Sequence, residues 1–192
     1  MHVKKMDLHK DMYDVIEAHQ KEYEQGKGVW KRVEYTDTIY ILVRSIRMRK
    51  ANRYRIFLVD KATDSFVSVM MLDPEQINWR HKEIFYTPTS YIIEEYRGLG
   101  LFAPLYRWFV DSGFNLKADS RQSEFSNRLW HRLIGEYHYL TVRDDALEGD
   151  TYTQMLNPKR LRKKHYVTLL FSNRWSQSDV QVFADRISRE EA

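Results

Sequence analysis

The stretch YIIEEYRGLGLF, residues 91–102, predicts a strand, a glycine turn and the start of a helix. An apolar run precedes Gly98 and Gly100. Apolar side chains then recur at helical spacing, in Leu101, Leu105, Trp108 and Phe109. The first N–H groups of such a helix have no partner within it and carry partial positive charge. Because glycines let the backbone come close to a bound group, the stretch predicts a cradle for an anion such as phosphate.

Two other phosphate-binding fingerprints can be compared with this turn. A Walker loop needs G-x-x-x-x-G-K-[ST], and no Lys-Ser or Lys-Thr follows here. The dinucleotide fingerprint G-x-G-x-x-G needs a third glycine where this chain has Ala103, a position that sometimes carries alanine. A nucleotide-binding enzyme of another kind therefore stays an alternative.

Residues 97–102 resemble the acetyl-CoA motif of the GNAT superfamily of N-acetyltransferases, [RQ]-x-x-G-x-[GA]. Arg97 and Gly100 match the motif, whereas Phe102 stands where the family usually has glycine or alanine. Residues 123–135 are similar to a second family segment, N-x-x-A-x-x-[LF]-Y-x-x-x-G. Its Asn, Ala and Tyr positions hold Ser123, Ser126 and Trp130, and the glycine is displaced by one, to Gly135. The resemblance covers roughly residues 55–145.

The resemblance implies an α+β fold, with a GNAT-like mixed, mostly antiparallel central sheet flanked by helices. It implies acetyl-CoA as co-substrate and transfer of its acetyl group to a primary amine of an unidentified small molecule or protein. The strand edge would pair with the pantetheine arm, and the turn would hold the pyrophosphate. The cofactor-binding residues implied in this way are Ile92, Ile93, Arg97, Gly98, Leu99, Gly100, Leu101 and Phe102.

Acetyl transfer by direct attack also needs a group that accepts a proton from the amine. Relatives often place a carboxylate near the start of the strand before the glycine turn. Tyr86 matches that position and Glu83 lies near it, so these two residues are the catalytic candidates. The family tyrosine that protonates the departing thiolate is replaced by Trp130, whose indole N–H is not acidic.

Other polar residues of the region have less specific roles. Tyr137 and Tyr139 are candidates for lining the acceptor pocket. The remaining acids and histidines of the region are interpreted as solvated or structural groups: Glu94, Glu95, His131 and His138.

Length and composition limit the classes of protein to which this chain can belong. The 192 residues are expected to form a single GNAT-like domain, residues 1–192, with an N-terminal helix and a C-terminal strand and helix added to the core. With 43% hydrophobic and 14% aromatic residues, the chain is expected to fold rather than to be disordered.

Cysteine is absent and the seven histidines show no ligand spacing, so no disulfide or metal site is expected. No membrane-length apolar run or signal peptide is evident, and we expect a cytoplasmic protein without membrane contact.

Two basic clusters, at 44–55 and 159–165, support an alternative function. The net charge of +4 permits an acidic partner without demanding one. Because Phe102 and Trp130 depart from the family motifs, the alternative is a catalytically degenerate GNAT-like binding protein. It would contact nucleic acid or a protein partner through these clusters.

The remaining pattern predicts alternating helices and strands. Helices are expected at 7–25 and 178–188, and strands at 30–35, 83–93, 114–118, 137–142 and 166–171. Residues 36–48 fit a helical stripe, but their β-branched content favours a strand. Residues 55–59 and 66–71 predict a hairpin, with a polar turn at 60–64. Residues 73–76 look like a helix start or turn, the 83–93 strand is expected to be interrupted or bulged near Pro88, and 144–158 is expected to be a loop.

Overall fold

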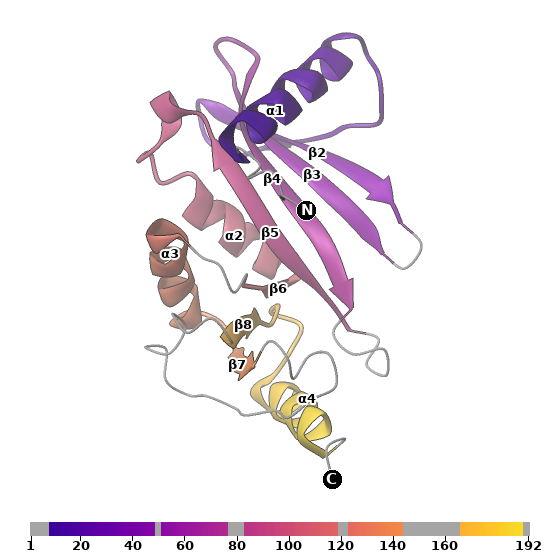
Figure 1. Cartoon of the computed structure of the whole chain (residues 1–192), viewed down its shortest axis with the longest axis vertical. Coiled ribbons are helices and arrows are strands. Elements are labelled where there is room, and N and C mark those ends of the chain that lie inside the picture. The colour runs from indigo at the N-terminus through magenta and orange to yellow at the C-terminus, as the bar shows by residue number, and fades with distance from the viewer. Residues whose placement is uncertain (1–7, 49–50, 77–82, 119–122, 144–165, 190–192) are drawn as a thin grey trace, which may run out of the picture. The chain divides into compact units, whose positions relative to one another are not determined.

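The computed structural model describes residues 8–48, 51–76, 83–118, 123–143 and 166–189. Its elements in chain order are α1 (Leu8–Glu24), β1 (Lys31–Glu34), β2 (Ile39–Arg47), β3 (Asn52–Asp60), β4 (Ser65–Gln76), β5 (Ile84–Ile92), a 3₁₀ turn η1 (Glu94–Tyr96), α2 (Phe102–Asp111), β6 (Asn115–Lys117), α3 (Glu124–Ile134), β7 (Tyr139–Arg143), β8 (Tyr166–Leu170) and α4 (Gln177–Arg189). The fold is α+β, with a mixed, mostly antiparallel sheet of strand order β1-β2-β3-β4-β5-β6-β8-β7 (Figure 1).

Contacts divide the chain into two compact units. Unit 1 comprises residues 1–73 and 89–99, and unit 2 comprises residues 74–88 and 100–192. β4 and β5 contribute residues to both units. The expected single domain over residues 1–192 stays a prediction.

Unit 1 is an antiparallel meander covered by α1. β1 pairs with β2, β2 with β3, and β3 with β4. Met12 and Ile16 lie one helical turn apart, and both are buried against side chains of β2, β3 and β4. Figure 1 shows α1 lying over these strands. The apolar stripe that predicts the helix is therefore the face that closes this core.

Unit 2 combines a parallel strand pair with an antiparallel one. β5 and β6 run parallel, with Phe85 opposite Asn115 and Tyr86 opposite Leu116, and α2 makes the crossover. β8 pairs antiparallel with both β6 and β7. The core on one face joins α4 to these strands through Phe85, Leu140, Val142, Val167, Leu169, Phe171, Val180, Phe183 and Ala184.

Most of the sequence-predicted elements are confirmed, including the 36–48 strand, the 60–64 turn and the pairing of 137–142 with 166–171. The prediction for 73–76 is wrong, because β4 continues as far as Gln76. Hydrogen bonds donated by the side chains of Thr87 and Lys117 to Glu75 fix this strand end, and such long-range contacts override the local signal of Pro74. β5 passes through Pro88 without interruption. The loop predicted at 144–158 lies outside the described residues.

The α3 segment offers a stability test. Ser123 is the N-cap of α3, and its hydroxyl accepts a hydrogen bond from the Ser126 amide at 3.1 Å. We expect Ser123→Ala to lower the free energy of unfolding by about 1 kcal/mol, since one amide of the first turn loses its partner. Chemical denaturation measures the change, and Ser123→Asp, which keeps the cap, should stay within about 0.5 kcal/mol of the wild type. Equal losses in the two variants would contradict the capping role.

Candidate functional site

The strand edge before the glycine turn belongs to unit 1. β5 ends at Ile92, and the Ile93 amide donates to the Val67 carbonyl at 3.0 Å. η1 follows at once, closed by bonds from the Tyr96 amide to the Ile93 carbonyl (3.2 Å) and from the Arg97 amide to the Glu94 carbonyl (3.0 Å). The chain therefore turns sharply before it reaches Gly98.

The Arg97 side chain folds back toward β5. Its Nε donates to the Ile92 carbonyl at 3.3 Å, and its guanidinium carbon lies 6.0 Å from the centre of the Tyr91 ring. The Ile92 carbonyl and the Ile93 amide belong to the strand edge that is expected to pair with pantetheine, and both take part in internal hydrogen bonds here. Since Arg97 is exposed, its long side chain has solvent around it in which to change rotamer.

Gly98 and Gly100 adopt the left-handed conformation that glycine favours, with φ of 79° and 71°. A Cβ atom added at either glycine would find no atom within 4 Å. Leu99, which separates them, is 63% exposed. The backbone immediately around each of the two glycines is therefore uncrowded.

In unit 2, α2 begins directly after Gly100, with Leu101 as N-cap and without a side-chain cap. The Phe102 side chain is buried, together with Leu105 and Tyr106. The bulky residue that departs from the family motif therefore has a buried side chain. In the first turn of α2, Phe102 and Ala103 carry amide N–H groups of the kind that an α-helix cannot satisfy internally, whereas Pro104 has none.

A charged cluster that the sequence analysis missed lies in unit 2. The Lys117 ammonium contacts the Glu75 carboxylate at 2.6 Å, and the Thr87 hydroxyl donates to the same carboxylate at 3.1 Å. The Lys117 side chain is only 10% exposed, whereas that of Glu75 is 45% exposed. Because a buried ammonium needs an opposite charge, Glu75 is fixed in place while it still faces solvent. The signal in the sequence was a lysine at a polar position of the alternating strand pattern at 114–118.

The two predicted catalytic residues also belong to unit 2. The Tyr86 ring packs edge-on against Phe114, with 5.2 Å between centroids. Successive side chains of a strand point to opposite faces, so Tyr86 lies on the face opposite to Thr87. Glu83 precedes β5 and is partly buried.

Trp130, at the position of the family's tyrosine, is a core residue. It is 1% exposed, and its ring packs edge-on against Tyr106 with 6.0 Å between centroids. The neighbouring His131 is exposed, as are His138, Glu94 and Glu95. These positions agree with the surface interpretation of the four polar residues.

Tyr137 lies at an open pocket of about 470 Å³ in unit 2, which Glu136, His138 and Trp175 also line. Its hydroxyl donates to the Asp111 carboxylate at 3.0 Å. Burial and this carboxylate raise the pKa of Tyr137 to about 12, so the residue stays a neutral phenol near pH 7. Its predicted role in lining the acceptor pocket, and that of Tyr139, stay predictions.

Three arginines of the first basic cluster form ion pairs within unit 1, whereas residues 49–50 of the same cluster lie outside the described residues. Arg44 pairs with Glu22, and its guanidinium carbon lies 5.3 Å from the centre of the Trp30 ring. Arg53 and Arg55 both pair with Asp73, and burial lowers the pKa of Arg55. These contacts reduce the charge available to a polyanion. The second cluster, at 159–165, lies outside the described residues.

Within the described ranges, no three or more histidine, aspartate or glutamate side chains gather as metal ligands do. Among the same residues, no helix has the length and apolar character needed to cross a membrane. Neither the protein-family models nor the curated proteins compared with this chain match it. The class that fold and site define is an α+β protein with a mixed sheet, an open glycine turn before a helix, and a partly buried Lys–Glu pair.

Proposed function

We propose that this protein is an acetyl-CoA-dependent N-acetyltransferase of the GNAT type, acting on a primary amine of a small molecule or protein. The observation that carries the proposal is the conformation of the turn. Gly98 and Gly100 are both left-handed and open, and α2 starts directly behind them without a side-chain cap. Backbone amides at a helix start, reached through glycines, are suited to a pyrophosphate.

The order of the elements supports the same proposal. The turn follows the C-terminal end of β5, and α2 then leads to the parallel strand β6. In open sheets, ligands bind beyond the carboxyl ends of parallel strands. The antiparallel pair of β7 and β8 closes the sheet as the family resemblance implies.

The reaction needs a nucleophile, a leaving group and a proton acceptor. The amine nitrogen attacks the thioester carbonyl carbon, a C–N bond forms, the C–S bond breaks, and CoA leaves as its thiolate. The proton that the amine loses passes to a base. Among the described carboxylates, we assign this role to Glu75, because it is fixed by Lys117 and Thr87 and is 45% exposed. Glu83 and Tyr86 remain the candidates that the sequence predicts.

A calorimetric titration tests the cofactor. We expect acetyl-CoA to bind in the micromolar range and acetyl-pantetheine, which lacks the pyrophosphate and the nucleotide, to bind at least about tenfold more weakly. Release of CoA in the presence of a panel of primary amines then identifies the acceptor. Absence of heat with acetyl-CoA, from protein shown to be folded by circular dichroism, would refute the proposal.

The place of action remains as the sequence predicts it. A chain without cysteine suits a reducing compartment, and acetyl-CoA is a metabolite of such compartments, so the cytoplasm is the proposed location.

A further inference from the structure

The turn between β3 and β4 is fixed by its own aspartate. Oδ1 of Asp60 accepts hydrogen bonds from the amides of Ala62 and Thr63, at 2.7 and 3.3 Å. The Asp64 amide donates to the Asp60 carbonyl at 2.8 Å, and Asp64 takes a left-handed φ of 54°. A carboxylate bound in this way has one oxygen oriented by the backbone and the other directed outward.

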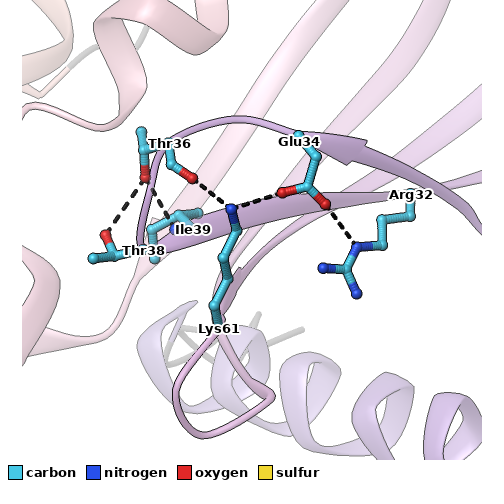
Figure 2. A network of polar contacts seen from close by, with 6 residues as sticks. All are labelled: Arg32, Glu34, Thr36, Thr38, Ile39 and Lys61. Atoms are coloured by element: carbon cyan, nitrogen blue, oxygen red, sulfur yellow. Dashed lines mark hydrogen bonds and ion pairs between the residues drawn. The ribbon is translucent and has the colours of Figure 1, made fainter.

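The same turn is bonded to the rest of unit 1. The Lys61 ammonium contacts the Glu34 carboxylate at 2.6 Å and the Thr36 carbonyl at 2.7 Å, as Figure 2 shows. The Tyr40 hydroxyl, from β2, donates to the Asp64 carboxylate. The turn therefore forms a rigid point in the described part of unit 1.

The second oxygen of Asp60 accepts a hydrogen bond from the Tyr96 hydroxyl at 2.5 Å. Tyr96 is the last residue of η1, a turn with no buried residue and no side-chain cap. Without core packing, backbone bonds alone would hold such a short turn weakly. The hydrogen bond from the Tyr96 phenol thus anchors η1, the segment just before Arg97 and Gly98, to the β3–β4 turn.

The Asp60 carboxylate stays charged and the Tyr96 phenol stays neutral over a wide pH range. The hydrogen bond from Tyr96 lowers the pKa of Asp60, and the same bond raises the pKa of Tyr96 to about 12. The carboxylate would take up a proton only as the pH falls below its usual range, and the phenol would give up its proton only near pH 12. The hydrogen bond between Tyr96 and Asp60 is therefore kept throughout the neutral pH range.

We propose that Asp60 and Tyr96 are positioning residues that hold Arg97 and Gly98 for the pyrophosphate of the acyl-CoA co-substrate. This inference rests on the proposed function. Arg97 follows Tyr96 directly in the chain, so a movement of η1 moves its guanidinium and the amide of Gly98 as well. A group held in advance binds an anion more tightly than a group that must first be ordered.

The chain provides a matched pair of variants. Tyr96→Phe removes the hydroxyl that bonds Asp60, and Tyr40→Phe removes the hydroxyl that bonds Asp64 in the same turn. We expect Tyr96→Phe to weaken acetyl-CoA binding about tenfold, the loss typical of one charge-assisted hydrogen bond, with acetyl-pantetheine binding unchanged. Tyr40→Phe should leave both affinities unchanged, because the amides of Ala62 and Thr63 still orient Asp60 and the bond from Tyr96 to Asp60 is kept.

A second measurement needs no ligand. Limited digestion with trypsin, followed by fragment masses, reports opening at the Arg97–Gly98 bond. We expect cleavage there to be about tenfold faster in Tyr96→Phe than in the wild type or Tyr40→Phe.

The two proposals fail differently. If the wild type does not bind acetyl-CoA, the proposed function fails. The trypsin result then still shows whether the Tyr96–Asp60 hydrogen bond restrains the chain at Arg97 and Gly98. If the wild type binds acetyl-CoA and Tyr96→Phe binds it equally well, the positioning role is refuted while the proposed function stands. Equal weakening of acetyl-CoA and acetyl-pantetheine binding would also overturn the role, because it would show a general structural effect.

Discussion

Replacement of Gly100 by glutamate is expected to weaken acetyl-CoA binding by at least about a hundredfold. Gly100 has a φ of 71°, and no atom lies within 4 Å of an added Cβ. A glutamate there would strain the backbone and place a carboxylate in the open turn, where it would repel the pyrophosphate. Calorimetric titration of both proteins with acetyl-CoA measures the effect.

Two further variants separate the causes of this loss. Gly100→Ala introduces the same left-handed strain without a charge, and we expect a loss of only about threefold to tenfold. Gly26→Glu adds a carboxylate at another open glycine, with a φ of 64°, beyond the end of α1. It should bind acetyl-CoA as the wild type does. If Gly100→Glu retained wild-type affinity, the turn would not be the pyrophosphate site.

Replacement of Glu75 by glutamine is expected to lower kcat at least about a hundredfold, with the affinity for acetyl-CoA unchanged. Glutamine has nearly the shape of glutamate and can still accept the hydrogen bond from Thr87, but it cannot take a proton from the amine. The rate is measured as CoA release with the most active amine of the acceptor panel, at a temperature where circular dichroism shows a folded protein. The temperature must be chosen in this way because Glu75→Gln leaves the Lys117 ammonium without its charged partner, which lowers the stability of the folded protein.

The sequence-predicted candidates serve as the matched controls for Glu75. Glu83→Gln makes the same chemical change at a carboxyl of the same unit, and Tyr86→Phe removes the phenol. Both variants should retain kcat within about threefold of the wild type. An acceptor that is already neutral at pH 7, such as an arylamine, should lose less in Glu75→Gln than an aliphatic amine does. A fall in kcat for Glu83→Gln with none for Glu75→Gln would return the role to the residue that the sequence predicts.

Local patterns were sufficient where the physical cause is local. The β3–β4 hairpin follows from polar turn residues between two apolar runs, and α1 follows from apolar residues one helical turn apart. The strand, glycine turn and helix at 91–102 were predicted from their spacing, and Gly98 and Gly100 do take the left-handed conformation. In each case neighbouring residues alone restrict the backbone.

Long-range contacts were beyond the reach of the sequence. Residues 73–76 carry the local signals of a turn, yet Glu75 extends β4 because it bonds Thr87 and Lys117. Trp130 stands at a family tyrosine position, but its contact with Tyr106 makes it a core residue. No spacing rule connects these partners, since they are brought together only when strands and helices far apart in the chain pack.

The sequence by itself determined most elements and the glycine turn between a strand and a helix, because backbone preference and apolar periodicity are properties of short segments. The α+β class, which the family resemblance implies, is confirmed. Only the tertiary structure decided which charges meet. The pairing of Lys117 with Glu75 depends on strand register, because a shift of one residue would turn either side chain to the other face of the sheet. The pairing of Tyr96 with Asp60 depends on where η1 lies beside the β3–β4 turn, 36 residues away in the chain.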